Sequence, residues 1–202
     1  MTLSIEEQRR IGAAIQTAEA KTSGEIVCVL ARASSDYLAY ATAWSALAAL
    51  IAPWLLIAFT QFSVQRIFLA QILIFTALFV VSSASGLRHR LVPRRVRRAQ
   101  AHRAAMEQFM IRGMARKANR AGVLIFVSFA ERYVRIIADD GIADKVDPSV
   151  WQDAVEALLG HVSDGRIGDG FVTAVEKCGA VLAAHFPPGE QKDELPDRIF
   201  VI

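Results

Sequence analysis

Two long stretches without a charged side chain constrain this chain more than any other feature. No Asp, Glu, Lys or Arg occurs over residues 37–65, and after the lone Arg66 none occurs again before Arg88. A bilayer core about 30 Å thick requires about 20 apolar residues per helical span. The two stretches therefore predict transmembrane helices at residues 38–60 and 67–84, with Pro53 able to kink the first one.

A buried helical hairpin of a soluble protein is the alternative interpretation. It would need a very large surrounding core, because both stretches are apolar on every helical face. A signal peptide does not fit, since the first stretch begins about 38 residues into the chain and no basic segment directly precedes it. The apolar content of 53% and the mean hydropathy of +0.33 agree with a membrane protein and exclude disorder for most of the chain.

Positive charge is concentrated directly after the second stretch. Residues 86–120 hold eleven Lys or Arg against one acid, although the net charge of the whole chain is only +3. The positive-inside bias counts such residues within about 15–20 positions of a span. We therefore expect a multi-pass protein of the inner (plasma) membrane with both termini in the cytoplasm. There, the two cysteines Cys28 and Cys178 would stay reduced.

The basic juxtamembrane segment covers residues 88–103. Its arginines are Arg88, Arg90, Arg94, Arg95, Arg97, Arg98 and Arg103. The simplest role of this segment is to fix the topology, and a compatible role is contact with anionic lipid headgroups through Arg94, Arg95, Arg97 and Arg98, worth on the order of 1 kcal/mol per residue. Nucleic-acid binding is not indicated, because no aromatic stacking platform accompanies the charge. The expected partners are an anionic bilayer and a protein that the sequence does not identify.

The residues outside the hairpin, 1–37 and 88–202, are predicted to form one discontinuous domain. Residues 24–31 are almost wholly apolar, which is typical of a buried strand, and such a strand needs partners beyond the hairpin. Residues 122–128 and 133–138 supply a β-hairpin, and residues 199–202 offer an edge strand. Strands of this kind with helices on both faces indicate an α/β/α sandwich.

Helical patterns surround these strands. Ser4 and Glu7 have the spacing of a capping box, which predicts a first helix ending near residues 22–24. Asp147 and Pro148 predict the start of another helix, and a last helix is expected to begin near residues 168–170. A further helix is expected over residues 94–119, with one side carrying Met106, Phe109, Met110 and Met114.

Candidate cation ligands are the acidic residues Asp139, Asp140 and Asp169. Oxygen-rich loops bind calcium, but a turn and a helix cap explain the same residues more simply. The four histidines lack ligand spacing, no Ser or Cys nucleophile has a base nearby in the sequence, and the cysteines fit small core positions. We therefore expect no catalytic residues and no cofactor.

Several of these segments resemble the TPM domain family. The resemblance covers residues 22–27, the hairpin at 122–142, the helix start at 168–174 and the final residues 184–187 with 194–197. It is most similar to a bacterial membrane-bound branch with two spans inserted after the first strand. The resemblance implies a small mixed sheet between helices. It also implies an unsettled activity, since weak phosphatase action is attributed to some members and calcium binding to others.

One position departs from the calcium-binding members of that family. They carry an acidic or amide pair directly before the second buried strand, where this chain has Arg120 and Ala121. The sequence therefore favours a membrane-anchored interaction or accessory module on the cytoplasmic face, without catalysis. The alternative is a weak phosphomonoester hydrolase or calcium-binding TPM domain that uses Asp139, Asp140 and Asp169.

Overall fold

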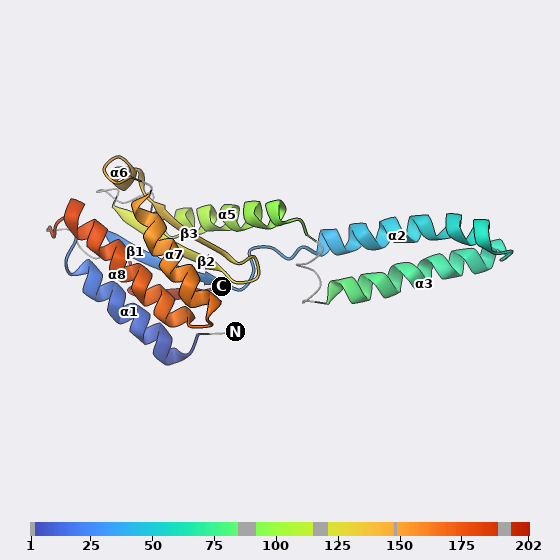
Figure 1. Cartoon of the computed structure of the whole chain (residues 1–202), viewed down its shortest axis with the longest axis horizontal. Helices are drawn as coiled ribbons and strands as arrows, with labels where there is room; N and C mark the ends of the chain where they lie inside the picture. The colour runs from blue at the N-terminus through green and yellow to red at the C-terminus, as the bar shows by residue number, and fades with distance from the viewer. Residues whose placement is uncertain (1–2, 85–91, 115–120, 148, 190–194) are drawn as a thin grey trace. The chain divides into compact units, whose positions relative to one another are not determined.

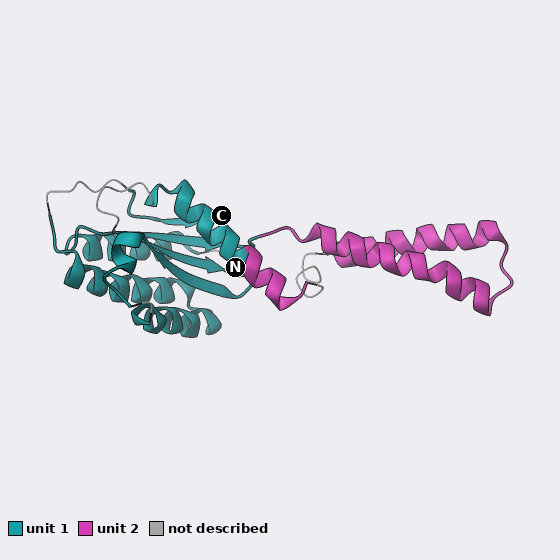
Figure 2. Ribbon diagram, turned by 90° about the horizontal axis from the view of Figure 1, so that it is seen from above, with its two compact units in different colours: residues 1–34, 101–202 teal, residues 35–100 magenta. Residues whose placement is uncertain are grey.

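The computed structural model describes residues 3–84, 92–114, 121–147, 149–189 and 195–202. The chain divides into two compact units, one with residues 1–34 and 101–202 and the other with residues 35–100 (Figure 2). The first unit therefore combines segments that precede and follow the two apolar helices in the sequence.

A four-stranded mixed sheet forms the centre of the first unit (Figure 1). The strands lie in the order β3 (Tyr133–Ala138), β2 (Gly122–Ser128), β1 (Glu25–Ala31) and β4 (Ile199–Val201). β1 is parallel to β2 and to β4, whereas β2 and β3 are antiparallel. The predicted hairpin, the edge strand and the pairing of residues 24–31 with partners beyond the apolar helices are thus present.

Helices cover both faces of this sheet (Figure 1). One face carries α1 (Ile5–Glu19), α7 (Val150–Ser163) and α8 (Ile167–His185), and the other carries α5 (Arg94–Ile111). Side chains alternate along β1, so that Ile26, Cys28 and Leu30 pack in the first layer and Val27, Val29 and Ala31 in the second. Since β1 and β2 are buried on both faces, their sequences are continuous apolar runs. The predicted α/β/α sandwich is confirmed.

The structure agrees with local sequence signals at α1 and α8. The Glu7 amide donates to Ser4 Oγ at 3.1 Å and the Ser4 amide donates to Glu7 Oε2 at 2.8 Å, which is the predicted capping box at the start of α1. On α8 an apolar stripe at helical spacing is fully buried; it comprises Phe171, Val175, Cys178 and Leu182. A small helix not predicted from the sequence, α6 (Asp140–Ala143), follows β3.

The apolar side that the sequence indicated for α5 is buried at only two of its four positions. Phe109 and Met114 are buried, but Met106 and Met110 are 41% and 60% exposed. The buried stripe of α5 consists of Ala101, Ala105 and Phe109, which are spaced four residues apart. The regular helix also ends at Ile111, and residues 115–119 of the predicted helix lie outside the described residues.

The start of α7 is two residues later than predicted. Ser149 occupies the N-cap position, and the side chain of Asp147 accepts a hydrogen bond from the Ser149 amide at 2.8 Å. Hydrogen bonds from Ser149 lower the pKa of the Asp147 carboxyl. Pro148 lies outside the described residues. Asp147 therefore supports the turn that precedes the helix and does not itself cap the helix.

The second unit contains two long apolar helices, α2 (Leu38–Phe59) and α3 (Val64–Ser83). The second helix begins three residues earlier than predicted, so Arg66 lies in its first turn and not in the connection. The buried positions of α2 are all small and occur at helical spacing: Ala41, Ser45, Ala49 and Ala52. Ser45 Oγ lies 3.3 Å from Ser82 Oγ on α3. Small residues at such spacing allow apolar helices to approach closely.

Large apolar side chains of these two helices are directed outward. Trp54 and Phe59 are 78% and 84% exposed, and the most apolar windows of α2 and α3 are only 11% and 0% buried. With 22 and 20 residues, the helices are about 33 and 30 Å long. Both are therefore long and apolar enough to cross a membrane. A helical hairpin buried in a soluble core does not fit this exposure.

Candidate functional site

The candidate ligands Asp139 and Asp140 lie where β3 ends and α6 begins. Asp139 Oδ1 accepts a hydrogen bond from the Asp140 amide at 2.7 Å, and the Asp139 amide donates to the Gly122 carbonyl at 2.9 Å. Asp139 is buried, and its Oδ2 makes no hydrogen bond within the described residues. Asp139 therefore caps α6, while one of its carboxylate oxygens is left without a partner there.

The third candidate ligand, Asp169, lies far from this pair. It is in the first turn of α8, where Asp169 Oδ1 accepts from Arg10 Nη2 at 2.7 Å. Ile167, two residues before Asp169, lines a small cavity together with Leu30 and Ala31 at the end of β1. Asp139, by contrast, is bonded to Gly122, which is in register with Glu25 at the start of β1. Across a strand of seven residues these ends are about 20 Å apart, so the three carboxylates do not form one site.

No metal-binding group forms elsewhere among the described residues. No cluster of three or more His, Cys, Asp or Glu side chains in these ranges has the geometry to hold a metal ion. The two cysteines are fully buried in the layer of α1 and α8. Burial raises the pKa of the Cys178 thiol to about 12 and raises that of Cys28 well above its usual range. Both thiols are therefore protonated at neutral pH and are not activated nucleophiles.

The predicted membrane-surface residues begin α5. Arg94, Arg95 and Arg98 are exposed and Arg97 is half-buried, and the first turn of α5 holds no acidic residue. Cations at this end of a helix are repelled by the helix dipole, so these arginines do not serve the stability of α5. Arg103, one turn further on, is also exposed, while Arg88 and Arg90 lie outside the described residues.

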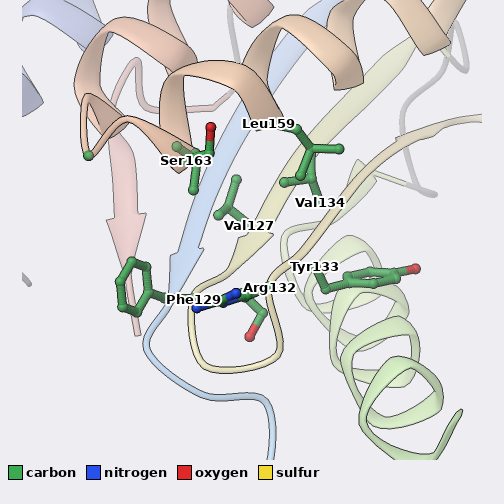
Figure 3. A pocket seen from close by; sticks show the side chains of 10 residues that line it. Val127, Phe129, Arg132, Tyr133, Val134, Leu159 and Ser163 are labelled. Carbon is green, nitrogen blue, oxygen red and sulfur yellow. The ribbon is translucent and has the colours of Figure 1, made fainter. Parts of the chain in front are cut away.

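One cavity of the sheet unit was not predicted from the sequence. It has a volume of about 430 Å³ and opens at the β2–β3 turn, beneath the end of α7 (Figure 3). Its walls are mainly apolar, and Arg132 is the charged residue among those lining it; the others that the close view labels around the cavity are Val127, Phe129, Val134, Leu159 and Ser163. The side chain of Tyr133 is turned away, toward α5. Arg132 has a positive φ of 50° within this turn.

A buried polar cluster lies next to this cavity. The Ser128 hydroxyl donates to the Glu131 carboxylate, and Ser34 Oγ donates to Ser128 Oγ at 2.8 Å. The Ser34 amide also donates to Glu131 Oε1 at 3.1 Å. Although Glu131 lies in a polar turn, it is only 6% exposed. The cluster joins the β2–β3 turn to the chain leaving β1, and its hydrogen bonds are used for this connection.

Comparison with protein families gives a match over part of the sheet unit. Residues 91–181 match the family model described as TPM domain. This segment of the chain is therefore similar to TPM domains. The matched residues include β2, β3 and all three candidate aspartates, and they begin only after the two apolar helices. Since β1 and β4 lie outside the match but pair within the same sheet, the folded unit extends beyond the matched segment of the TPM domain.

A solved structure shows the same fold. It is the NMR structure of the BA42 protein from the psychrophilic bacterium Bizionia argentinensis, with a TM-score of 0.61 and 23% sequence identity. The alignment covers 100% of this chain and 96% of BA42. At this identity the similarity concerns the fold alone. A comparison with curated proteins gave no significant match.

Proposed function

We propose that this protein is a membrane-anchored TPM domain that serves as a binding or accessory module on the cytoplasmic face of the inner membrane. The observation that carries the proposal is the exposure of α2 and α3, whose apolar windows are 11% and 0% buried. Exposed apolar surface of this extent needs lipid or another apolar surface to cover it. Because the helices interrupt a single sheet unit, they would hold that unit at the bilayer.

The positive charge supports the cytoplasmic orientation. Two spans place both ends of the chain on one side, and the arginines at the start of α5 directly follow the second span. They are Arg94, Arg95, Arg97 and Arg98. Basic residues this close to a span favour the cytoplasmic side. On that side they would meet anionic headgroups, which compensates for their unfavourable position at a helix N-terminus.

Reporter fusions test this topology. A reporter fused after Ile202 is expected to give a cytoplasmic signal, and a reporter inserted between α2 and α3, at residues 60–63, the opposite signal. Replacing the four arginines by glutamine is expected to increase the fraction of inverted chains, since Arg88, Arg90 and Arg103 remain. Replacing Arg9 and Arg10 on α1 by glutamine is the matched control and should leave the topology unchanged. A periplasmic C-terminus in the unchanged chain contradicts the proposal.

A binding role is favoured because the carboxylates and thiols that could take part in catalysis have structural roles instead. Asp169 pairs with Arg10, and the carboxylate of Glu131 accepts hydrogen bonds at the β2–β3 turn. The buried cysteines have raised pKa values and remain protonated. A module of this kind acts through a protein partner, and co-purification from mildly solubilised membranes would identify that partner.

One observation favours the alternative, a calcium-binding or phosphoester-hydrolysing domain. Asp139 Oδ2 is buried without a hydrogen bond within the described residues, and such an oxygen is a suitable cation ligand. Under our proposal, calcium leaves the melting temperature unchanged and a generic phosphomonoester is not turned over. A calcium-induced rise in melting temperature that is lost in Asp139→Asn, or turnover that is lost in Asp140→Ala, would establish the alternative. Asp169→Asn is the matched control.

A further inference from the structure

β3 leaves one side of the sheet open. It is the last strand in the order β3-β2-β1-β4 and pairs with β2 alone within the described residues. The Asp139 amide donates to the Gly122 carbonyl, which sets the alternation of the antiparallel ladder. In that alternation the backbone N–H and C=O groups of Tyr133, Arg135 and Ile137 form hydrogen bonds with β2. The backbone N–H and C=O groups of Val134, Ile136 and Ala138 therefore point to the open side.

The opposite side of β2 confirms this assignment. The Phe129 amide donates to the Ala31 carbonyl and the Glu25 amide donates to the Ala121 carbonyl. Odd-numbered residues of β2 therefore bond toward β1 and even-numbered ones toward β3. No backbone group in the described ranges bonds to the three outward-facing residues of β3. The edge thus offers three donors and three acceptors to an added strand.

A groove runs beside this edge, between β3 and α7. The cavity at the β2–β3 turn, about 430 Å³, adjoins a second one of about 600 Å³, and the two share Tyr133, Val134 and Leu159. The second cavity continues along β3 to Ile136 and along α7 to Trp151. Val134 and Ile136 pack toward α7, so the floor of the groove is apolar. An added strand would place every second side chain into it.

Charge at this edge selects the kind of strand. Arg132 and Arg135 are exposed, and neither forms an ion pair within the described residues. The Arg135 side chain is on the face of α5, because Arg135 is paired with Phe126 of that layer. Antiparallel pairing of β3 with β3 of a second copy would bring like charges together. An acidic strand gains from the same arginines.

We propose that the open edge of β3 binds an extended segment of a partner protein, in which apolar residues alternate with acidic ones. The apolar residues would enter the groove beside α7, and the acidic residues would face Arg135 on the other side. Strand addition of this type takes affinity from backbone hydrogen bonds and specificity from alternate side chains. This inference rests on the proposed function as a binding module and gives its docking site.

Peptide binding to the full chain in detergent micelles tests the proposal. The probe is a fluorescent synthetic peptide in which Val and Glu alternate, and the control peptide replaces each Glu by Lys. We expect the Glu peptide to bind at least tenfold more tightly. Arg135→Glu should weaken it by about tenfold or more and reverse the preference. Arg9→Glu, the same charge change on α1, should leave binding unchanged.

Amide hydrogen exchange provides the readout that simple charge attraction would not change. The Glu peptide should slow exchange at Val134, Ile136 and Ala138, whereas Arg135 and Ile137 are already bonded to β2. Ala138→Pro removes one outward N–H at little cost in packing and should weaken binding. Pro is tolerated at a strand edge when its nitrogen faces outward. Equal binding of both peptides, binding unaffected by Arg135→Glu, or unchanged exchange at β3 would overturn the proposal.

Two further outcomes separate this inference from the proposed function. Self-association of the chain that protects the same three amides would assign the edge to a second copy and overturn the peptide site alone. Phosphoester turnover that depends on Asp140 would overturn the proposed module function, whether or not the peptide binds. A chain without turnover that also fails to bind the Glu peptide would overturn only the docking site.

Discussion

Val27→Asp is expected to abolish folding of the α/β unit. Val27 is 2% exposed, lies in the central strand β1 and packs in the layer formed by Phe109 of α5 and Phe126 of β2. Burying an unpaired carboxylate there costs several kcal/mol, against a total stability of about 5–15 kcal/mol. Thermal unfolding of the full chain in detergent, followed by circular dichroism, should show no cooperative transition of the sheet unit.

Val150→Asp is the matched control for this substitution. Val150 is 42% exposed and is the first residue of α7. An acidic side chain in the first turn of a helix interacts favourably with the helix dipole, by about 0.3–1 kcal/mol. The control should therefore unfold at or slightly above the temperature of the unchanged chain. Cooperative unfolding of Val27→Asp near that temperature would show that Val27 is not in the core.

Features that depend on short stretches of sequence were predictable. The continuous apolar runs at 24–31 and 122–128 indicate strands covered on both faces, and the structure has β1 and β2 there. The capping box at Ser4 depends on two residues three positions apart. The two apolar helices follow from length and hydropathy alone. In each of these cases the physical cause lies within a few turns or one strand.

Predictions failed where burial of a residue depends on the element that packs against it. The methionines of α5 are large and apolar, so the sequence favours them as buried residues. The sheet instead packs against the stripe with Ala101, Ala105 and Phe109, and Met106 and Met110 remain exposed. Similarly, Glu25 has the sequence pattern of a polar residue at the start of a strand, which predicts that Glu25→Gln changes the stability only slightly. In the structure, however, Glu25 is 5% exposed. Exposure of such residues depends on contacts that the local pattern does not contain.

The candidate site was the least predictable part. Ser34 and Glu131 are 97 residues apart in the sequence, so their hydrogen bond follows only from the folded sheet. The groove beside β3 depends on the placement of α7, whose Leu159 lines it and is 41% exposed. The candidate aspartates belong to opposite ends of the sheet, which spacing in the sequence does not reveal.

The second prediction with a large effect concerns the interrupted domain. Replacing residues 36–87 by a flexible Gly/Ser linker is expected to give a soluble protein that unfolds cooperatively. The sheet, the helices α1, α7 and α8, the buried residues of α5 and both layers of the core belong to residues 1–34 and 101–202. A linker of about ten residues spans on the order of 15–20 Å, which allows β1 to return to the sheet. The linked protein should remain monomeric without detergent.

The segment 88–202 without β1 is the decisive comparison. β1 lies between β2 and β4 and pairs with both, so the loss of β1 together with α1 leaves two strand edges and the apolar face of α8 uncovered. Exposed edges and apolar surface favour aggregation. We expect this segment to aggregate or to unfold without a cooperative transition, in thermal unfolding measured beside the linked protein. If it unfolds as cooperatively as the linked protein, β1 is dispensable, and the two apolar helices would then separate an independent N-terminal segment from a complete domain.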